Sequence, residues 1–157
     1  MKLKIVVFDQ EQSLRNLLRV YLAGQGHEVQ AFRAPDVCPL YHNLLAERCC
    51  CPRERPCADV VLIDSRLQNI NALEFLKLQR RHGCKALDAN KAVMSASMTK
   101  TQEEAIAEFG CHHIRKPFRL AEIKSWIKAC AARLAAPHGL SDRDKLCAMA
   151  DNHSQFR

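Results

Sequence analysis

Short apolar runs alternate with amphipathic segments along most of the chain. The run at residues 59–64 (Asp-Val-Val-Leu-Ile-Asp) is apolar between its two acids, as expected for a strand buried on both faces of a parallel sheet. Shorter runs of the same kind recur at intervals. Together they predict five strands, at residues 3–8, 27–32, 59–64, 91–95 and 111–115.

The segments between these runs have the periodicity of helices. We predict helices through residues 14–22, 37–47, 72–81, 101–109 and 119–135. The first carries one apolar face, formed by Leu14, Leu17, Leu18, Tyr21 and Leu22, and the last carries an apolar stripe formed by Leu120, Ile123, Ile127, Ala131 and Leu134. Strands that alternate with helices predict a parallel sheet covered on both faces.

Right-handed crossovers turn this series into an α/β, doubly wound, five-stranded parallel sheet with the flavodoxin-like order 2-1-3-4-5. A chain of 157 residues suits one such domain. We assign residues 1–136 to the domain and residues 137–157 to a polar C-terminal tail.

Composition narrows the classes of function. The chain has no long apolar run and no signal-peptide pattern near Met1, so we expect a cytoplasmic protein that does not span a membrane. The net charge of +7 is compatible with binding to nucleic acid. The basic residues are scattered, however, and no helix-turn-helix or aromatic RNA-binding motif is present, so we expect no direct DNA binding.

Polar residues stand where four of the strands end. Asp9 follows the first strand, Asp64 and Ser95 end the third and fourth, and Lys116 comes just after the fifth. In a doubly wound sheet of this order the functional site lies at the carboxyl ends of strands one and three. We therefore predict that two carboxylates, a hydroxyl and an ammonium converge at one edge.

These residues carry a family resemblance. The segments Val7-Phe8-Asp9-Gln10-Glu11, Leu62-Ile63-Asp64, Met94-Ser95-Ala96 and Arg115-Lys116-Pro117-Phe118 resemble, in order and placement, the four signature positions of bacterial response-regulator receiver domains. The match covers about residues 3–134. Each segment is a weak signal alone, but together, at the right strand ends, they are a strong one.

The resemblance implies a switch that is controlled by phosphorylation. Such a protein catalyses at most the transfer of a phosphoryl group to itself, and is not otherwise an enzyme. Asp64 would be the phosphoacceptor, and Lys116 would contact a phosphoryl oxygen. Mg²⁺ would be bound at Asp9, Gln10, Asp64 and the backbone carbonyl of Arg66. Ser95 would turn inward to the phosphoryl group, and the side chain of His113 would move into the space that it leaves.

The same resemblance implies the partners. We expect phosphoryl transfer from a sensor histidine kinase or a phosphotransfer protein, and output through contact with a downstream protein, since no effector-domain pattern follows residue 135. The sequence does not determine the oligomeric state, and a homodimer is one alternative. It also leaves open a second interpretation, in which a degenerate receiver acts as a phosphorylation-independent adaptor or dimerisation module. A phosphatase of related topology would need a general acid two residues after Asp64. That position is Arg66, which cannot act as a general acid, so we disfavour this function.

Three departures from the family pattern bear on activity. Gln10 stands where the family usually has a second acid, so we expect weaker binding of Mg²⁺. The turn after Asp64, residues 67–72, lacks the usual Pro and Gly. His113 replaces the usual Tyr or Phe and predicts a pH-sensitive switch.

The cysteines give a separate signal. Cys49, Cys50, Cys51 and Cys57 precede the third strand and Cys84 precedes the fourth, which places them at the edge opposite Asp64. Cys49, Cys51, Cys57 and Cys84, or three thiolates with His82, are candidate ligands of a structural Zn²⁺. The alternative is a cluster of reduced thiols. Cys38, Cys111, Cys130 and Cys147 are interpreted as core or incidental residues.

Overall fold

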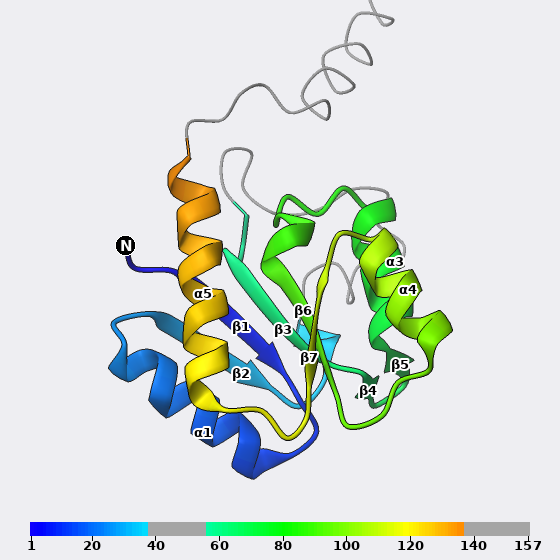
Figure 1. The fold of residues 1–157 in the computed structure, drawn as a ribbon, viewed down its shortest axis with the longest axis horizontal. Coiled ribbons are helices and arrows are strands. Elements are labelled where there is room, and N and C mark those ends of the chain that lie inside the picture. The colour runs from blue at the N-terminus through cyan, green and yellow to red at the C-terminus, as the bar shows by residue number, and fades with distance from the viewer. Residues whose placement is uncertain (38–55, 137–157) are drawn as a thin grey trace, which may run out of the picture.

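Five parallel strands form one sheet in the order β2-β1-β3-β6-β7 (Figure 1). The computed structural model describes residues 1–37 and 56–136. Its elements are β1 (Lys4–Phe8), α1 (Gln12–Gly24), β2 (Glu28–Phe32), a 3₁₀ turn (Pro35–Val37), β3 (Val60–Asp64), β4 (Arg66–Leu67), β5 (Ile70–Asn71), α3 (Ala72–Arg81), a 3₁₀ turn (Asp88–Asn90), β6 (Lys91–Ser95), α4 (Lys100–Glu108), β7 (His112–Arg115) and α5 (Leu120–Ala135). The predicted flavodoxin-like fold is confirmed.

The apolar pattern of β3 follows from its central place in the sheet. Its residues pair with β1 on one side, Leu62 opposite Val7, and with β6 on the other, Ile63 opposite Val93. The first four residues of the strand are at most 3% exposed. Only Asp64, at its carboxyl end, is partly accessible, and this end of the strand is where polar groups gather.

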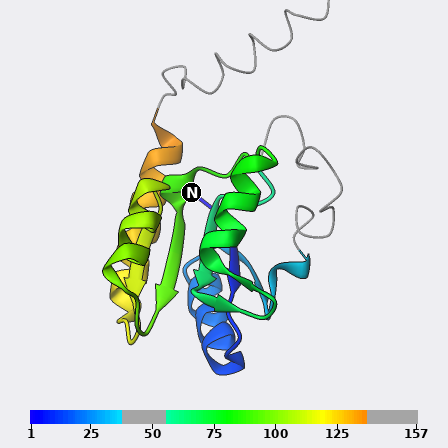
Figure 2. The same cartoon turned by 90° about the vertical axis from the view of Figure 1, so that its right-hand side faces the viewer.

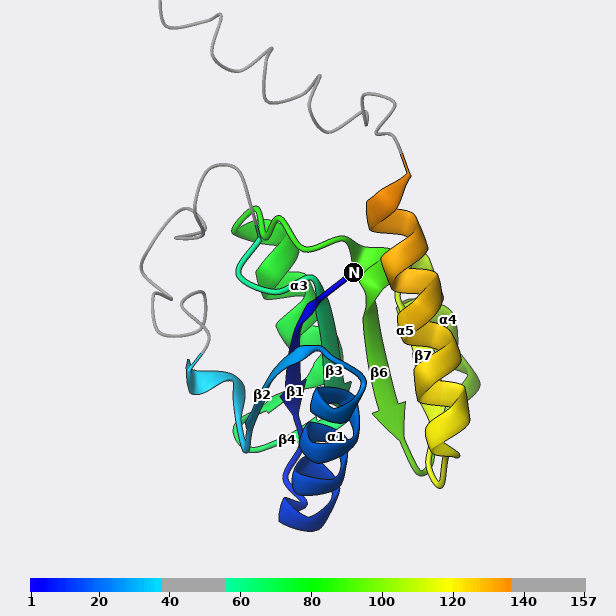
Figure 3. The ribbon, with the colours of Figure 1, turned by 90° about the vertical axis from the view of Figure 1, so that its left-hand side faces the viewer.

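In the described part of the chain, two pairs of helices cover the sheet. Leu18 and Leu22 of α1 pack with Ile123 and Ile127 of α5 in the core on one face, which is turned to the viewer in Figure 3. On the other face α3 and α4 contribute a second core that includes Phe75, Leu76 and Ile106, on the side seen in Figure 2. No helix in residues 1–37 or 56–136 has the length and apolar character needed to cross a membrane.

Capping boxes fix the starts of α3 and α4. The side chain of Asn71 accepts a hydrogen bond from Glu74 N, and that of Thr99 accepts one from Gln102 N. The Glu74 and Gln102 side chains accept hydrogen bonds from the peptide N–H groups of Asn71 and Thr99 in return. Each box satisfies backbone donors that a helix start otherwise leaves unpaired.

The apolar face predicted for the first helix was too wide. Leu18 and Leu22 are fully buried and Leu14 and Tyr21 partly so, but Leu17 is 47% exposed. A helix lying on a flat sheet buries a narrow stripe, and Leu17 lies beyond its border. Of the helix predicted at 37–47, only residue 37 is described, in a 3₁₀ turn. The strand predicted from His27 begins at Glu28.

A small hairpin follows β3 that the sequence did not predict. β4 and β5 pair antiparallel, with Leu67 opposite Ile70, in a separate two-stranded sheet. Asn69 closes the turn with φ of 69°. Asn tolerates this left-handed conformation better than most residues other than glycine, so the turn forms here without a glycine.

Candidate functional site

Asp9 is the most deeply buried acid of the site. It follows β1, is 0% exposed, and accepts a hydrogen bond at Oδ1 from Glu11 N at 2.9 Å. The guanidinium of Arg15, one turn into α1, donates from Nη1 to the carbonyl oxygens of Asp9 (2.7 Å) and Gln10 (2.8 Å). Arg15 thereby fixes the loop after β1, and nothing in the sequence pattern singled it out.

Lys116 lies between the two acids. Its Nζ is 2.7 Å from Oδ2 of Asp9 and 3.5 Å from Oδ1 of Asp64. Its peptide N–H donates to the carbonyl of Ser95 at 2.7 Å, which ties the end of β7 to the end of β6. The structure thus brings together the two carboxylates and the ammonium that the strand ends predicted.

Burial and the neighbouring carboxylate both act on Asp64. Loss of solvent raises its pKa above the ordinary 3.8, and the negative charge of Asp9 raises it further. The Lys116 ammonium and the Arg66 N–H, 3.4 Å from Oδ1, act in the opposite direction. Burial and Asp9 therefore make the charged form of Asp64 less favourable than it is in water, and an additional cation at this site would favour that form.

The oxygen-rich donor set fits such a cation. The carboxylates of Asp9 and Asp64 both lie near the ammonium of Lys116. Carboxylate oxygens are also the ligands that Mg²⁺ prefers. The side chain of Gln10 is exposed, while its carbonyl is bonded to Arg15. Arg66, the fourth predicted ligand position, donates its peptide N–H to Asp64.

Ser95 makes its contact with His113, not with the acids. Ser95 is 1% exposed, and its Oγ lies 2.9 Å from Nε2 of His113 on the neighbouring strand β7. The other ring nitrogen, Nδ1, is 3.7 Å from Oε1 of Glu103 in α4. The sequence did not predict a role for Glu103, because only the packing of α4 on β7 brings it near His113.

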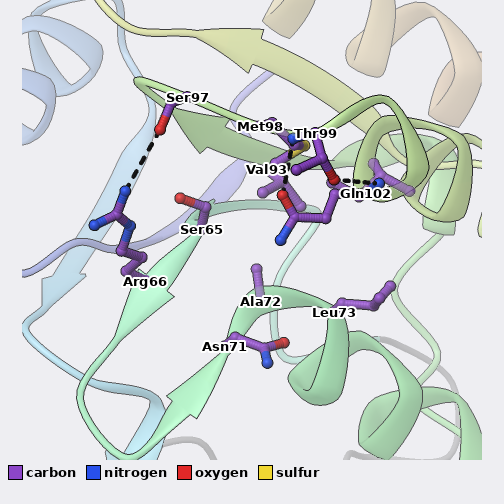
Figure 4. A pocket seen from close by; sticks show the side chains of 11 residues that line it. Ser65, Arg66, Asn71, Ala72, Leu73, Val93, Ser97, Met98, Thr99 and Gln102 are labelled. Carbon is purple, nitrogen blue, oxygen red and sulfur yellow. Dashed lines mark hydrogen bonds between the residues drawn. The ribbon is translucent and has the colours of Figure 1, made fainter.

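A cavity of about 440 Å³ adjoins the edge between α3 and α4 (Figure 4). Arg66 and Ser97 are among the residues that line it, with Arg66 Nη2 3.5 Å from Ser97 Oγ. The N-cap residues of both helices, Asn71 and Thr99, also line it. Residues that follow β3 and β6, among them Ser65 and Ser97, therefore border open space.

The described residues give the predicted zinc site no support. Cys49, Cys50 and Cys51 lie outside them, and no group of three Cys, His, Asp or Glu side chains within the described ranges could hold a metal. Cys57 is exposed and Cys84 is buried. Cys111 and Cys130 are core residues, as predicted, and burial raises the pKa of both thiols to about 11.

Comparison with known proteins supports this fold from structure alone. The sequence matches no protein-family model and no curated protein. The HemR receiver domain from Leptospira biflexa aligns with a TM-score of 0.66 at 19% identity, covering 87% of this chain and 99% of that one. The receiver domain of Francisella response regulator 1452 gives 0.66 at 15% (85% and 99%). A beryllofluoride-activated NtrC4 receiver dimer gives 0.63 at 14% (81% and 94%). The chain therefore has the fold of response-regulator receiver domains.

Proposed function

We propose that this protein is a phosphoryl switch that accepts a phosphoryl group on Asp64 and signals by contact with another protein. The observation that carries the proposal is the position of Lys116, whose Nζ lies 2.7 Å from Asp9 and 3.5 Å from Asp64. A cation shared by two acids at the carboxyl edge of a doubly wound sheet is suited to an anionic phosphoryl group.

In the proposed reaction a carboxylate oxygen of Asp64 attacks the phosphorus of a donor. A new O–P bond forms, the bond from phosphorus to the donor's leaving atom breaks, and the leaving group keeps that electron pair. Lys116 balances the negative charge of the transferred group. Asp9, Asp64 and the carbonyl of Arg66, with Gln10, would hold Mg²⁺, which lowers the repulsion between the anionic donor and the carboxylate.

Among donors we propose the phosphohistidine of a sensor kinase or of a phosphotransfer protein. The output would begin at Ser95, which exchanges its contact with His113 for one with the phosphoryl group. Because His113 lies on β7 and contacts Glu103 of α4, this exchange would be transmitted to the surface formed by α4, β7 and α5.

Mass spectrometry tests the acceptor. Incubation with Mg²⁺ and acetyl phosphate should add about 80 Da, the mass of one phosphoryl group in place of a proton. Asp64→Asn should abolish this addition. Asp59→Asn, just before the opposite end of the same strand, should retain it. Undiminished labelling of Asp64→Asn would rule out Asp64 as the acceptor.

The second candidate function is that of a phosphorylation-independent adaptor. Gln10 favours it, because the amide supplies no negative charge for the metal. The same experiment separates the two. An unlabelled wild-type protein that also fails to bind beryllofluoride with Mg²⁺ would favour the adaptor.

A further inference from the structure

Three side chains connect the buried end of β6 to the surface of α4. Ser95 Oγ is 2.9 Å from His113 Nε2, and His113 Nδ1 is 3.7 Å from Glu103 Oε1. Exposure increases along the series: the Ser95 residue is 1% exposed, the His113 side chain 21% and the Glu103 side chain 38%. The imidazole thus lies between a buried hydroxyl and a partly exposed carboxylate.

The direction of the Ser95–His113 hydrogen bond depends on where the imidazole carries its proton. A neutral histidine has one N–H donor and one acceptor nitrogen. With the proton on Nδ1, Nε2 is an acceptor and the Ser95 hydroxyl must donate to it. With the proton on Nε2, the imidazole donates and the hydroxyl hydrogen of Ser95 is available to another acceptor.

Glu103 favours the first arrangement. At 3.7 Å its carboxylate is too far from Nδ1 for a direct hydrogen bond but close enough for a strong charge interaction. A negative charge beside Nδ1 stabilises a proton on that nitrogen, and the partner of one ring nitrogen determines the role of the other. Arg115 Nη2 lies 3.7 Å from the same oxygen but is 78% exposed, so solvent weakens its competition for the carboxylate.

We propose that Glu103 is a positioning residue that acts through His113 to keep the hydroxyl hydrogen of Ser95 directed at the imidazole. The proposal rests on the proposed function, since it concerns the same Ser95. While Glu103 is charged, Ser95 must break a hydrogen bond before it can donate to a phosphoryl group. Removal of that charge releases the hydroxyl and favours the phosphoryl-bound arrangement.

The tautomer of His113 is the direct test, and it needs no phosphoryl group. In ¹⁵N-labelled protein, two-bond ¹H–¹⁵N spectra distinguish the protonated from the acceptor ring nitrogen. We expect Nδ1–H in the wild type and a shift toward Nε2–H in Glu103→Gln. The matched control is Glu104→Gln, the adjacent acid of α4, which is 62% exposed and 4.0 Å from Lys100. It should leave the spectrum of His113 unchanged.

A second measurement reads the consequence for Ser95. Titration with beryllofluoride and Mg²⁺ should show binding about fivefold tighter in Glu103→Gln than in wild type, the scale of one hydrogen bond. Glu104→Gln should bind like wild type. An unchanged affinity in a variant whose tautomer has changed would overturn the link to Ser95.

Two results would overturn the role of Glu103 itself. One is an Nε2–H tautomer in the wild type, and the other is an identical His113 spectrum in Glu103→Gln. If beryllofluoride binds to none of the proteins, the proposed function of Asp64 fails, while the tautomer comparison still decides whether Glu103 positions His113.

Discussion

Gln10 is the residue that most changes the charge of the site. Its side chain is exposed, and Arg15 bonds to its carbonyl oxygen at 2.8 Å. The loop after β1 therefore offers Asp9 and an amide where two acids are usual in receivers. The fold tolerates this exchange, because the loop is held through backbone oxygens that any residue at position 10 would supply.

Gln10→Asp should tighten the binding of Mg²⁺ about tenfold, since an added carboxylate gains roughly 1.4 kcal/mol from the dication. Isothermal titration calorimetry measures the change. Gln12→Asp, at a position that is also exposed at the start of α1, is the control and should have little effect. Equal tightening in both variants would mean that only the general charge of the surface matters.

Asp64→Asn should raise the free energy of unfolding by about 1 kcal/mol near neutral pH without divalent metal, the scale of one charge interaction at a partly exposed site. Burial and Asp9 raise the pKa of Asp64 in the folded protein. Ionisation of Asp64 therefore destabilises the folded state, in full above that raised pKa and not at all below the ordinary value of 3.8.

The gain from Asp64→Asn should accordingly shrink as the pH falls through this window. Urea unfolding with EDTA at several pH values measures it. Asp36→Asn, at an exposed acid, should show no such trend. A gain that persists undiminished below pH 3.8 would contradict the linkage.

At the scale of elements, the sequence predicted what periodicity encodes. β6 and α3 were predicted with their observed ends, because Asn71 and Glu74 mark the start of α3 and Gly83 closely follows its end. The β4–β5 hairpin was not predicted, because strands of two residues are too short to show a periodic pattern. The exposure of Leu17 depends on the shape of the surface beneath α1, which no local pattern records.

The hairpin turn can be tested at Asn69. Asn69→Ala should destabilise the protein by about 1 kcal/mol, since its φ of 69° is strained for a residue with an ordinary side chain. Asn69→Gly should be neutral, because glycine accepts this conformation. Chemical denaturation compares the two. Equal destabilisation by both variants would point to a lost side-chain contact, not to backbone strain.

At the scale of the whole molecule, the two edges of the sheet carry different charge networks. The carboxyl edge holds Asp9, Asp64 and Lys116. At the amino edge Lys91, only 1% exposed, lies 3.0 Å from Asp88, which also pairs with Arg80 at 3.0 Å. This second network contains none of the proposed phosphoryl-binding residues, so we assign it to stability.

Asp88→Asn should therefore cost about 3 kcal/mol of unfolding free energy, because it leaves the Lys91 ammonium buried without its carboxylate. Labelling of Asp64 by acetyl phosphate should be unchanged at temperatures where the variant is folded. Glu104→Gln, in an exposed pair, should cost less than about 0.5 kcal/mol. Impaired labelling in a folded Asp88→Asn protein would contradict this separation of the two edges.

The limits of sequence reasoning also show at this scale. Topology placed Asp9, Asp64 and Lys116 at one edge because each ends or directly follows a parallel strand, and the structure brings them into contact. Arg15 and Glu103 reach the site from helices. A helix can present any of its faces to the sheet edge, so the spacing of these residues along the chain predicts no such contact.

The place of Lys116 has one more consequence. Asp9, Asp64 and Lys116 together carry a single net negative formal charge. A magnesium dication and an acyl phosphate with about two negative charges would bring the same pocket to neutrality. This neutrality depends on Gln10, because an acid at position 10 would add one negative charge to the pocket. The phosphorylated pocket would thus differ from the unoccupied one by a single unit of charge and would carry no net formal charge of its own. A partner would find no net charge to bind there and would have to recognise a change of shape.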